Sequence, residues 1–360
     1  MSQNGTALNA SSLTSQPLVL VNLLTWKKRP GYDSPQDPGP RKDYLELARR
    51  LGAELMGYQA ADEGWYRWLY PLEKRLKLDL SLAMKAAAVK HPRAILSTNE
   101  KVAIPLALWM SLRRRDTPHV VIAHKLSSGV KARAFSLWQV EKHIAHLIVL
   151  CQTQADYAVR HLGFPAERVH FIRDKVDHLF YRPEPVEAED YLLAVGRENR
   201  DYETLVQAVS GTGLRLVVVA SSPWSTSRSR PVQAEDVTFL SHIPYSQLKS
   251  LYARARLVVT PLHPVDYAAG VNGVLEAMSM GRPLIVSRSP GIVDYVQDGE
   301  TGLFVEPSNP EALRDTMLSL WHDRPLQQRL GANARQAVEE GLNLDRYVEE
   351  VARVVEQAAG

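Results

Sequence analysis

The sequence predicts an α/β fold made of two Rossmann-like domains, whose parallel sheets face each other across a cleft. Three observations lead to this prediction. Short apolar stretches of strand length alternate with stretches of helical pattern along the chain. A segment rich in prolines and acids, R-P-E-P-V-E-A-E, interrupts this alternation at residues 182–189. A length of 360 residues also favours two domains over one.

The domain organisation follows from this interruption. We expect residues 1–16 to form a disordered polar tail. Residues 17–183 and 184–340 form the two Rossmann-like domains, and residues 341–360 form a helix that packs back toward the first domain.

In the first half of the chain, continuous apolar runs predict buried strands, and periodic apolar positions predict helices between them. The predicted strands are 18–24, 93–98, 120–123, 146–151 and 169–172, and the predicted helices are 43–51, 65–90, 102–112 and 153–162. A loop rich in proline follows the first strand and contains Gly31 and Gly39, which could face a substrate or lie on a mobile surface.

The second half repeats the pattern. The predicted strands are 191–195, 214–220, 237–240, 257–260 and 284–286, and the predicted helices are 202–209, 245–255, 311–321, 326–341 and 347–358. This alternation predicts a second parallel sheet that is covered on both faces. The cleft between two such halves is the default binding site.

Composition excludes several classes of protein. Apolar residues make up 45% and charged residues 23%, and the formal net charge of +3 gives no general argument for a nucleic-acid partner. The single cysteine, Cys151, excludes an intrachain disulfide and a cysteine-ligated zinc site, and we expect it to be a buried thiol. The N-terminus lacks the features of a signal peptide and no apolar run is long enough to cross a membrane, so we predict a cytoplasmic protein.

The stretch Val271–Leu303 contains the most informative acid. Asn272 is a plausible N-cap of a short apolar helix, which would place Glu276 in the first turn, where the helix dipole favours negative charge. Gly270 and Gly273 leave the backbone bare at the same helix N-terminus, where a phosphate could bind. An acid that binds hydroxyls beside an anion site indicates a nucleoside diphosphate. The alternative is a capped helix whose Glu276 is simply solvated.

Two further candidates come directly after predicted strands, where α/β proteins place their sites. His124 follows strand 120–123, and it is either functional or structural. Arg197 follows strand 191–195, where a guanidinium can pair bidentately with a phosphate.

Several motifs in the second half of the chain resemble those of a known family. The motifs A-V-G-R (194–197), V-L-E-A-M-S-M-G-R-P-L-I-V (274–286) and D-Y-V-Q-D-G-E-T-G-L-F-V-E-P (294–307) occur in order, after the interdomain segment V-D-H-L-F-Y-R-P (176–183). Together they resemble the nucleotide-binding domain of the retaining GT-B glycosyltransferases of family 4, also called glycosyl transferases group 1. The resemblance covers about residues 169–340, whereas the first 150 residues resemble the family only in their strand–helix rhythm and in His124.

The resemblance implies a GT-B fold, in which the first domain binds a hydroxyl acceptor and the second a nucleoside-diphosphate sugar. It implies that Glu276 binds the ribose hydroxyls, that Arg197 neutralises the diphosphate and that His124 contacts the donor sugar. It also implies transfer with retention of anomeric configuration, without a metal and without a cofactor, from a UDP- or GDP-linked co-substrate. The acceptor would be a glycan, a glycolipid or a small molecule.

Three departures from the family pattern matter. The glutamate usual eight positions before Glu276 is Ala268 here, and the glycine pair usual in the first loop is missing. The lysine usual after the Gly-Arg loop is also absent, and Arg200 near its place could supply that charge or lie on the surface. We therefore expect other residues ahead of Glu276 to meet the donor sugar: Asp266, Gly270, Val271 and Asn272.

Two other functions, a silent binding protein and an epimerase, are alternatives to a glycosyltransferase. Ala268 favours a catalytically silent nucleotide-sugar-binding protein on the same scaffold. Epimerisation of a nucleotide sugar would need paired acid and base groups, which the sequence does not place. The aromatic and basic segment from Trp65 packs either on a sheet, the favoured interpretation, or with Arg113–Arg115 against the inner membrane surface as a peripheral contact. The sequence does not predict the oligomeric state.

Overall fold

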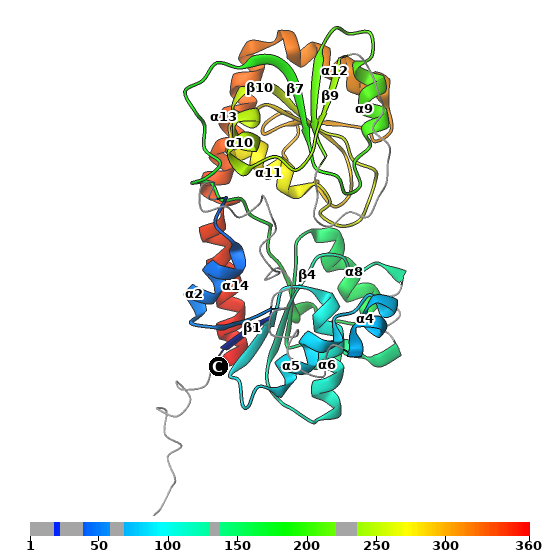
Figure 1. The fold of residues 1–360 in the computed structure, drawn as a ribbon, viewed down its shortest axis with the longest axis vertical. Helices are drawn as coiled ribbons and strands as arrows, with labels where there is room; N and C mark the ends of the chain where they lie inside the picture. Colours follow the sequence, from blue (N-terminus) through cyan, green and yellow to red (C-terminus); the bar gives the residue numbers. More distant parts are fainter. Residues whose placement is uncertain (1–17, 22–38, 58–67, 130–134, 136, 221–235) are drawn as a thin grey trace, which may run out of the picture.

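The structure, a computed structural model, describes residues 18–21, 39–57, 68–129, 135, 137–220 and 236–360. These residues form two α/β domains that lie one above the other in Figure 1. Each domain contains one sheet of six strands, and every strand pair is parallel. The predicted fold class is confirmed.

The first sheet has the strand order β2-β1-β3-β4-β5-β6. Its strands are β1 (Leu18–Val21), β2 (Glu54–Met56), β3 (Ala94–Ser97), β4 (His119–Ala123), β5 (His146–Val149) and β6 (Val169–Phe171). One face is covered by α5 (Leu80–Ala88), α6 (Glu100–Leu112) and α8 (Gln152–Leu162), and the opposite face by α2 (Asp43–Leu51) and α14 (Leu344–Ala359). Neighbouring strand residues such as Leu18 and Val19 enter the two different cores, as the alternation of side chains along a strand requires.

The second sheet has the order β12-β11-β10-β7-β8-β9. Its strands are β7 (Glu189–Val195), β8 (Arg215–Val219), β9 (Val237–Leu240), β10 (Ala255–Thr260), β11 (Leu284–Ser287) and β12 (Leu303–Val305). Helices α10 (Tyr245–Arg254), α11 (Val271–Ser279) and α13 (Arg324–Glu340) pack on one face, and α9 (Tyr202–Val209) and α12 (Pro310–His322) on the other.

The last helix returns to the first domain. The apolar side chains of α14, including Leu344 and Val351, share a core with Leu18 and Leu20 of β1. Arg50 of α2 forms salt bridges with two glutamates of α14. In Figure 1, α14 lies beside α2, far along the chain from it, so the chain crosses between the domains twice.

The structure corrects the predicted helix at 65–90. Two helices, α4 (Tyr70–Leu76) and α5, occupy the described part of this segment, and Lys77 at φ 55° ends the first of them. The three-residue strands β2 and β12 were not predicted. The predicted tail, the loop around Gly31 and the end of the first strand after Val21 lie outside the described residues.

Candidate active site

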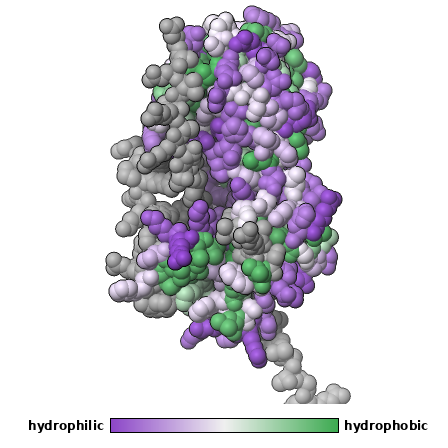
Figure 2. Space-filling model, turned by 90° about the vertical axis from the view of Figure 1, so that its right-hand side faces the viewer, coloured by the Kyte–Doolittle hydropathy of each residue, from purple (hydrophilic) through white to green (hydrophobic). Residues whose placement is uncertain are grey.

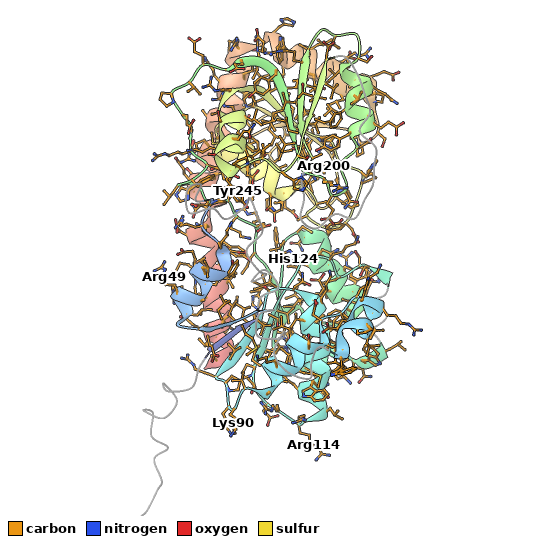
Figure 3. The ribbon with its side chains drawn as sticks, viewed as in Figure 1. Arg49, Lys90, Arg114, His124, Arg200 and Tyr245 are labelled. Atoms are coloured by element: carbon orange, nitrogen blue, oxygen red, sulfur yellow. The ribbon has the colours of Figure 1, made fainter. Side chains whose placement is uncertain are left out.

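The candidate site lies where the carboxyl ends of the two sheets face each other. The loop after β4 carries His124, the loop after β7 carries Arg197 and Arg200, and the loop after β10 leads into α11. Figure 3 shows His124 at the edge of the first domain that faces the second, and Arg200 at the facing edge of the second domain. The topology therefore brings predicted residues from distant parts of the chain to the facing edges of the two domains.

Helix α11 starts differently from the prediction. It begins at Val271 after Gly270, whose φ of 86° is in the left-handed region. Asn272 is the second residue of the helix and its side chain is exposed, so its predicted role as N-cap is wrong. Glu276 consequently lies beyond the first turn, and the helix dipole does not explain its position.

Tyrosines, rather than the helix terminus, surround Glu276. The Tyr252 hydroxyl donates a hydrogen bond to Glu276 Oε2 at 2.9 Å. Burial raises the pKa of Glu276 to about 7, against the opposing effects of the tyrosine hydroxyls and of the Arg200 guanidinium. The interpretation of Glu276 as a simply solvated residue is wrong.

Tyr181 is the second tyrosine that interacts with Glu276. Burial raises the pKa of its hydroxyl, and the nearby Glu276 carboxylate raises it further. Its hydroxyl in turn lowers the pKa of Glu276, as that of Tyr252 does. Both Tyr181 and Tyr252 are buried in the apolar core that packs against α11, so the acid is held at the boundary of that core and the cleft.

The Arg200 guanidinium packs against Gly196 and Gly270, which have no side chains to displace it. Its Nε donates to the Val195 carbonyl oxygen at 3.0 Å, and its Nη1 donates to the Glu198 carbonyl oxygen at 2.9 Å. A Cβ at Gly196 would lie 2.3 Å from Arg200 Nη2, and one at Gly270 would lie 3.2 Å from Nη1. A larger residue at Gly196 would therefore displace the guanidinium.

The half-buried Arg200 guanidinium and the N-terminus of α11 place positive charge together. Burial lowers the pKa of Arg200, which shows that its charge lacks full solvation. The first N–H groups of a helix also carry partial positive charge and lack partners inside the helix. An anion between the two would be stabilised by both. Arg200 therefore lies beside the start of α11, and its role toward the diphosphate stays a prediction.

The other two candidates, Arg197 and His124, also follow the carboxyl ends of strands. Arg197 follows Gly196 at the end of β7 and is half-buried. His124 is exposed, and its Nε2 lies 3.1 Å from the Thr98 carbonyl oxygen. That contact assigns the proton to Nε2 in the neutral ring, which leaves Nδ1 as an acceptor.

The loop ahead of α11 contacts the first domain. Asp266 Oδ1 accepts a hydrogen bond from Ser127 Oγ at 2.9 Å. Ala268 is packed against apolar cores of both domains. The Tyr267 hydroxyl donates to Glu198 Oε1 at 3.1 Å, and Lys125 Nζ lies 4.4 Å from the centre of its ring. Asp266, predicted to meet the donor sugar, thus bonds across the cleft in this structure.

Comparison with known proteins decides the family of the second domain. The family model for glycosyl transferases group 1 matches residues 182–337. These residues contain Arg197, Arg200 and Glu276 together with all of α11.

The second domain belongs to this family.

Curated relatives of the chain carry glycosyltransferase names. D-rhamnosyltransferase WbpZ of Pseudomonas aeruginosa is 27% identical over 48% of this chain and 44% of that protein. O-antigen chain mannosyltransferase C of Escherichia coli is 26% identical over 45% of each chain. The match therefore spans less than half the length of either relative. Alpha-D-kanosaminyltransferase of Streptomyces kanamyceticus is 22% identical over 80% of this chain and 82% of that protein.

Solved structures show the fold of the whole chain. Sucrose-phosphate synthase of Thermosynechococcus elongatus has a TM-score of 0.70 at 18% identity, covering 95% of this chain and 98% of its own. Anabaena HepE in complex with UDP-glucose has a TM-score of 0.71 at 15% identity, covering 95% and 99%. The two-domain GT-B fold predicted from the sequence is thereby confirmed.

Proposed function

We propose that the chain is a retaining glycosyltransferase that moves a sugar from a nucleoside-diphosphate sugar to a hydroxyl acceptor. The observation that carries this proposal is the convergence of Arg200, Glu276 and the N-terminus of α11 on one side of the cleft. An arginine and free helix amides suit a diphosphate. A carboxylate beside them suits the ribose hydroxyls, which donate hydrogen bonds to it.

The proposed roles follow the charges that develop during transfer. The bond between the anomeric carbon and the diphosphate oxygen breaks, and its electron pair leaves with the diphosphate. Arg200, Arg197 and the α11 amides would stabilise that negative charge, which is electrostatic catalysis by preorganised groups. The acceptor hydroxyl then bonds to the same face of the sugar, and its proton passes to the leaving diphosphate.

The other predicted residues have supporting roles in this proposal. His124 Nδ1 would accept a hydrogen bond from a hydroxyl of the donor sugar, from the side of the first domain. Gly270 and Asn272 would contact the diphosphate or the sugar through their backbone N–H groups, and Val271 would do so in exchange for its 3.5 Å bond to the Ala268 carbonyl oxygen. Asp266 would contribute through its bond to Ser127.

The proposed reaction uses no metal. The arginines and the helix N-terminus supply the positive charge instead. The donor would be linked to UDP or GDP, and the chain would need no further cofactor.

A turnover assay over a panel of UDP- and GDP-linked sugars, with simple hydroxyl acceptors and with water, tests the proposal. The released nucleoside diphosphate is measured. We expect at least one donor to be turned over, and Gly196→Val, which displaces Arg200, to reduce its use. Saturable binding without release from any donor would instead establish a silent nucleotide-sugar-binding protein, the alternative that Ala268 favours.

We also propose that the first domain contacts a membrane surface. Trp68 is 85% exposed, Leu112 is 77% exposed and Leu137 is 75% exposed, and Arg113–Arg115 follow α6 directly. Figure 2 shows hydrophobic patches on the lower, first domain. None of the helices that the structure describes is both long and apolar enough to span a bilayer. Sedimentation with anionic and with zwitterionic vesicles tests this contact, and recovery of all protein in the supernatant of both would contradict it.

A further inference from the structure

A buried glutamine connects the two sides of the cleft. Gln154, in the first turn of α8, is 1% exposed. Its side-chain oxygen accepts a hydrogen bond from the Leu126 backbone N–H at 2.6 Å, and its Nε2 donates to the Asp266 carbonyl oxygen at 2.9 Å. The opposite orientation of the amide would set N–H against N–H and one oxygen against another, so these partners fix its orientation. One side chain therefore bonds a loop of each domain.

On the first-domain side, buried side chains accept hydrogen bonds from the backbone of the loop that carries His124. The buried Glu100 carboxylate accepts hydrogen bonds from the backbone N–H groups of His124 at 3.1 Å and of Lys125 at 3.2 Å. With the Leu126 bond to Gln154, three consecutive N–H groups are held by two buried side chains. This loop is therefore a rigid part of the first domain.

On the second-domain side, the bonds end on the loop that leads into α11. Ser127 Oγ donates to Asp266 Oδ1 at 2.9 Å, beside the bond from Gln154 to the carbonyl oxygen of the same residue. Asp266 lies a few residues before Val271, where α11 begins. The bonds of Gln154 and Ser127 thus help to set the distance between His124 and the start of α11, together with the bond from Gln152 N–H to Asp294.

We propose that Gln154 is a positioning residue for sugar transfer, an inference that rests on the proposed function. Gln154 helps to hold the two domains in the arrangement that the structure shows, with the loop that carries His124 facing the donor site of the second domain. It acts through the two loops and does not need to touch the donor. A small misplacement of groups around a reacting centre reduces turnover strongly, whereas the nucleotide contacts lie within the second domain.

The test compares Gln154→Met, which keeps the size of the side chain and removes its polar atoms, with Gln152→Met. Gln152 lies two residues earlier on α8, is exposed and bonds through its side chain to Asp156 only, so it is the matched control. We expect Gln154→Met to lower kcat by about 10- to 100-fold and to keep the affinity for UDP or GDP within about twofold. Its radius of gyration, measured by small-angle X-ray scattering, should exceed that of the wild type and of the control.

If Gln154→Met fails to fold, Ser127→Ala removes the neighbouring bond to Asp266 and should lower kcat several-fold with unchanged nucleotide affinity. The proposal is overturned if the folded variant has the kcat and the radius of gyration of the wild type, or if nucleotide affinity falls in parallel with kcat. If the wild type itself releases no nucleoside diphosphate, the proposed function fails and the catalytic role of Gln154 with it. The radius of gyration then still decides whether Gln154 holds the domains together.

Discussion

Replacement of Glu276 by glutamine should stabilise the folded protein at high pH and should weaken its proposed binding of the nucleoside diphosphate. Glutamine keeps the size of the side chain and an oxygen that can accept the Tyr252 hydrogen bond, but it carries no charge. The pKa of Glu276 is raised from an ordinary value of 4.5 to about 7, so the folded protein prefers the protonated acid. The unfolded chain ionises this group at the ordinary pKa, and the folded protein therefore loses stability as the pH rises from about 4.5 to about 7.

The size of this loss follows from the pKa difference. A rise from 4.5 to about 7 corresponds to on the order of 3 kcal/mol for the ionised form, and about 2 kcal/mol remains after allowance for the solvent that reaches this half-buried residue. Glu276→Gln removes the penalty. At pH 8 the variant should be more stable than the wild type by about 2 kcal/mol, and at pH 5 the advantage should be small.

Urea unfolding followed by circular dichroism at pH 5 and pH 8 measures this difference. Glu311→Gln, at an exposed glutamate of the same domain, is the control and should show no such dependence on pH. A stability difference that is the same at both pH values, or that favours the wild type at pH 8, would refute the reasoning. The same variant should bind the nucleoside diphosphate about 30-fold more weakly, because charge-assisted bonds to the ribose are lost.

Three further predictions concern the other charges. Arg200→Ala should weaken nucleoside-diphosphate binding at least tenfold but leave the weak affinity for the bare nucleoside unchanged, as measured by calorimetry; equal losses for both ligands would contradict a phosphate contact. His124→Ala should lower kcat more than nucleotide affinity, and a parallel fall of the two in steady-state kinetics and calorimetry would exclude its contact with the sugar. EDTA in the turnover assay should leave the rate unchanged, and a loss that Mg²⁺ restores would show that a metal is required.

Much of the fold could be predicted because the apolar pattern of each segment agrees with the place of that segment in the sheet. The continuous apolar runs of β4, β7 and β10 are typical of strands buried on both faces, and they gave correct positions for these strands. Strands β2 and β12 are three residues long, which is too short for such a run. The break at Lys77 depends on a left-handed backbone conformation that its residue type does not signal.

The candidate site could be predicted only where its residues lie in one contiguous motif. Glu276 and the start of α11 belong to such a stretch, and Arg200 lies in the loop that follows another. The partners that define their chemistry come from elsewhere in the chain. Tyr252 lies on α10, and Gln154 lies in the other domain, so only the packing of the chain brings them to the site. The cap at Gly270 was missed because asparagine is also a common N-cap.

A crystal structure with the nucleoside diphosphate that raises the melting temperature most tests the central claim most directly. We expect the ribose hydroxyls within hydrogen-bonding distance of the Glu276 carboxylate, and the diphosphate between Arg200 and the N-terminus of α11. A nucleotide bound away from α11, or one whose ribose does not reach Glu276, would contradict the proposed donor site.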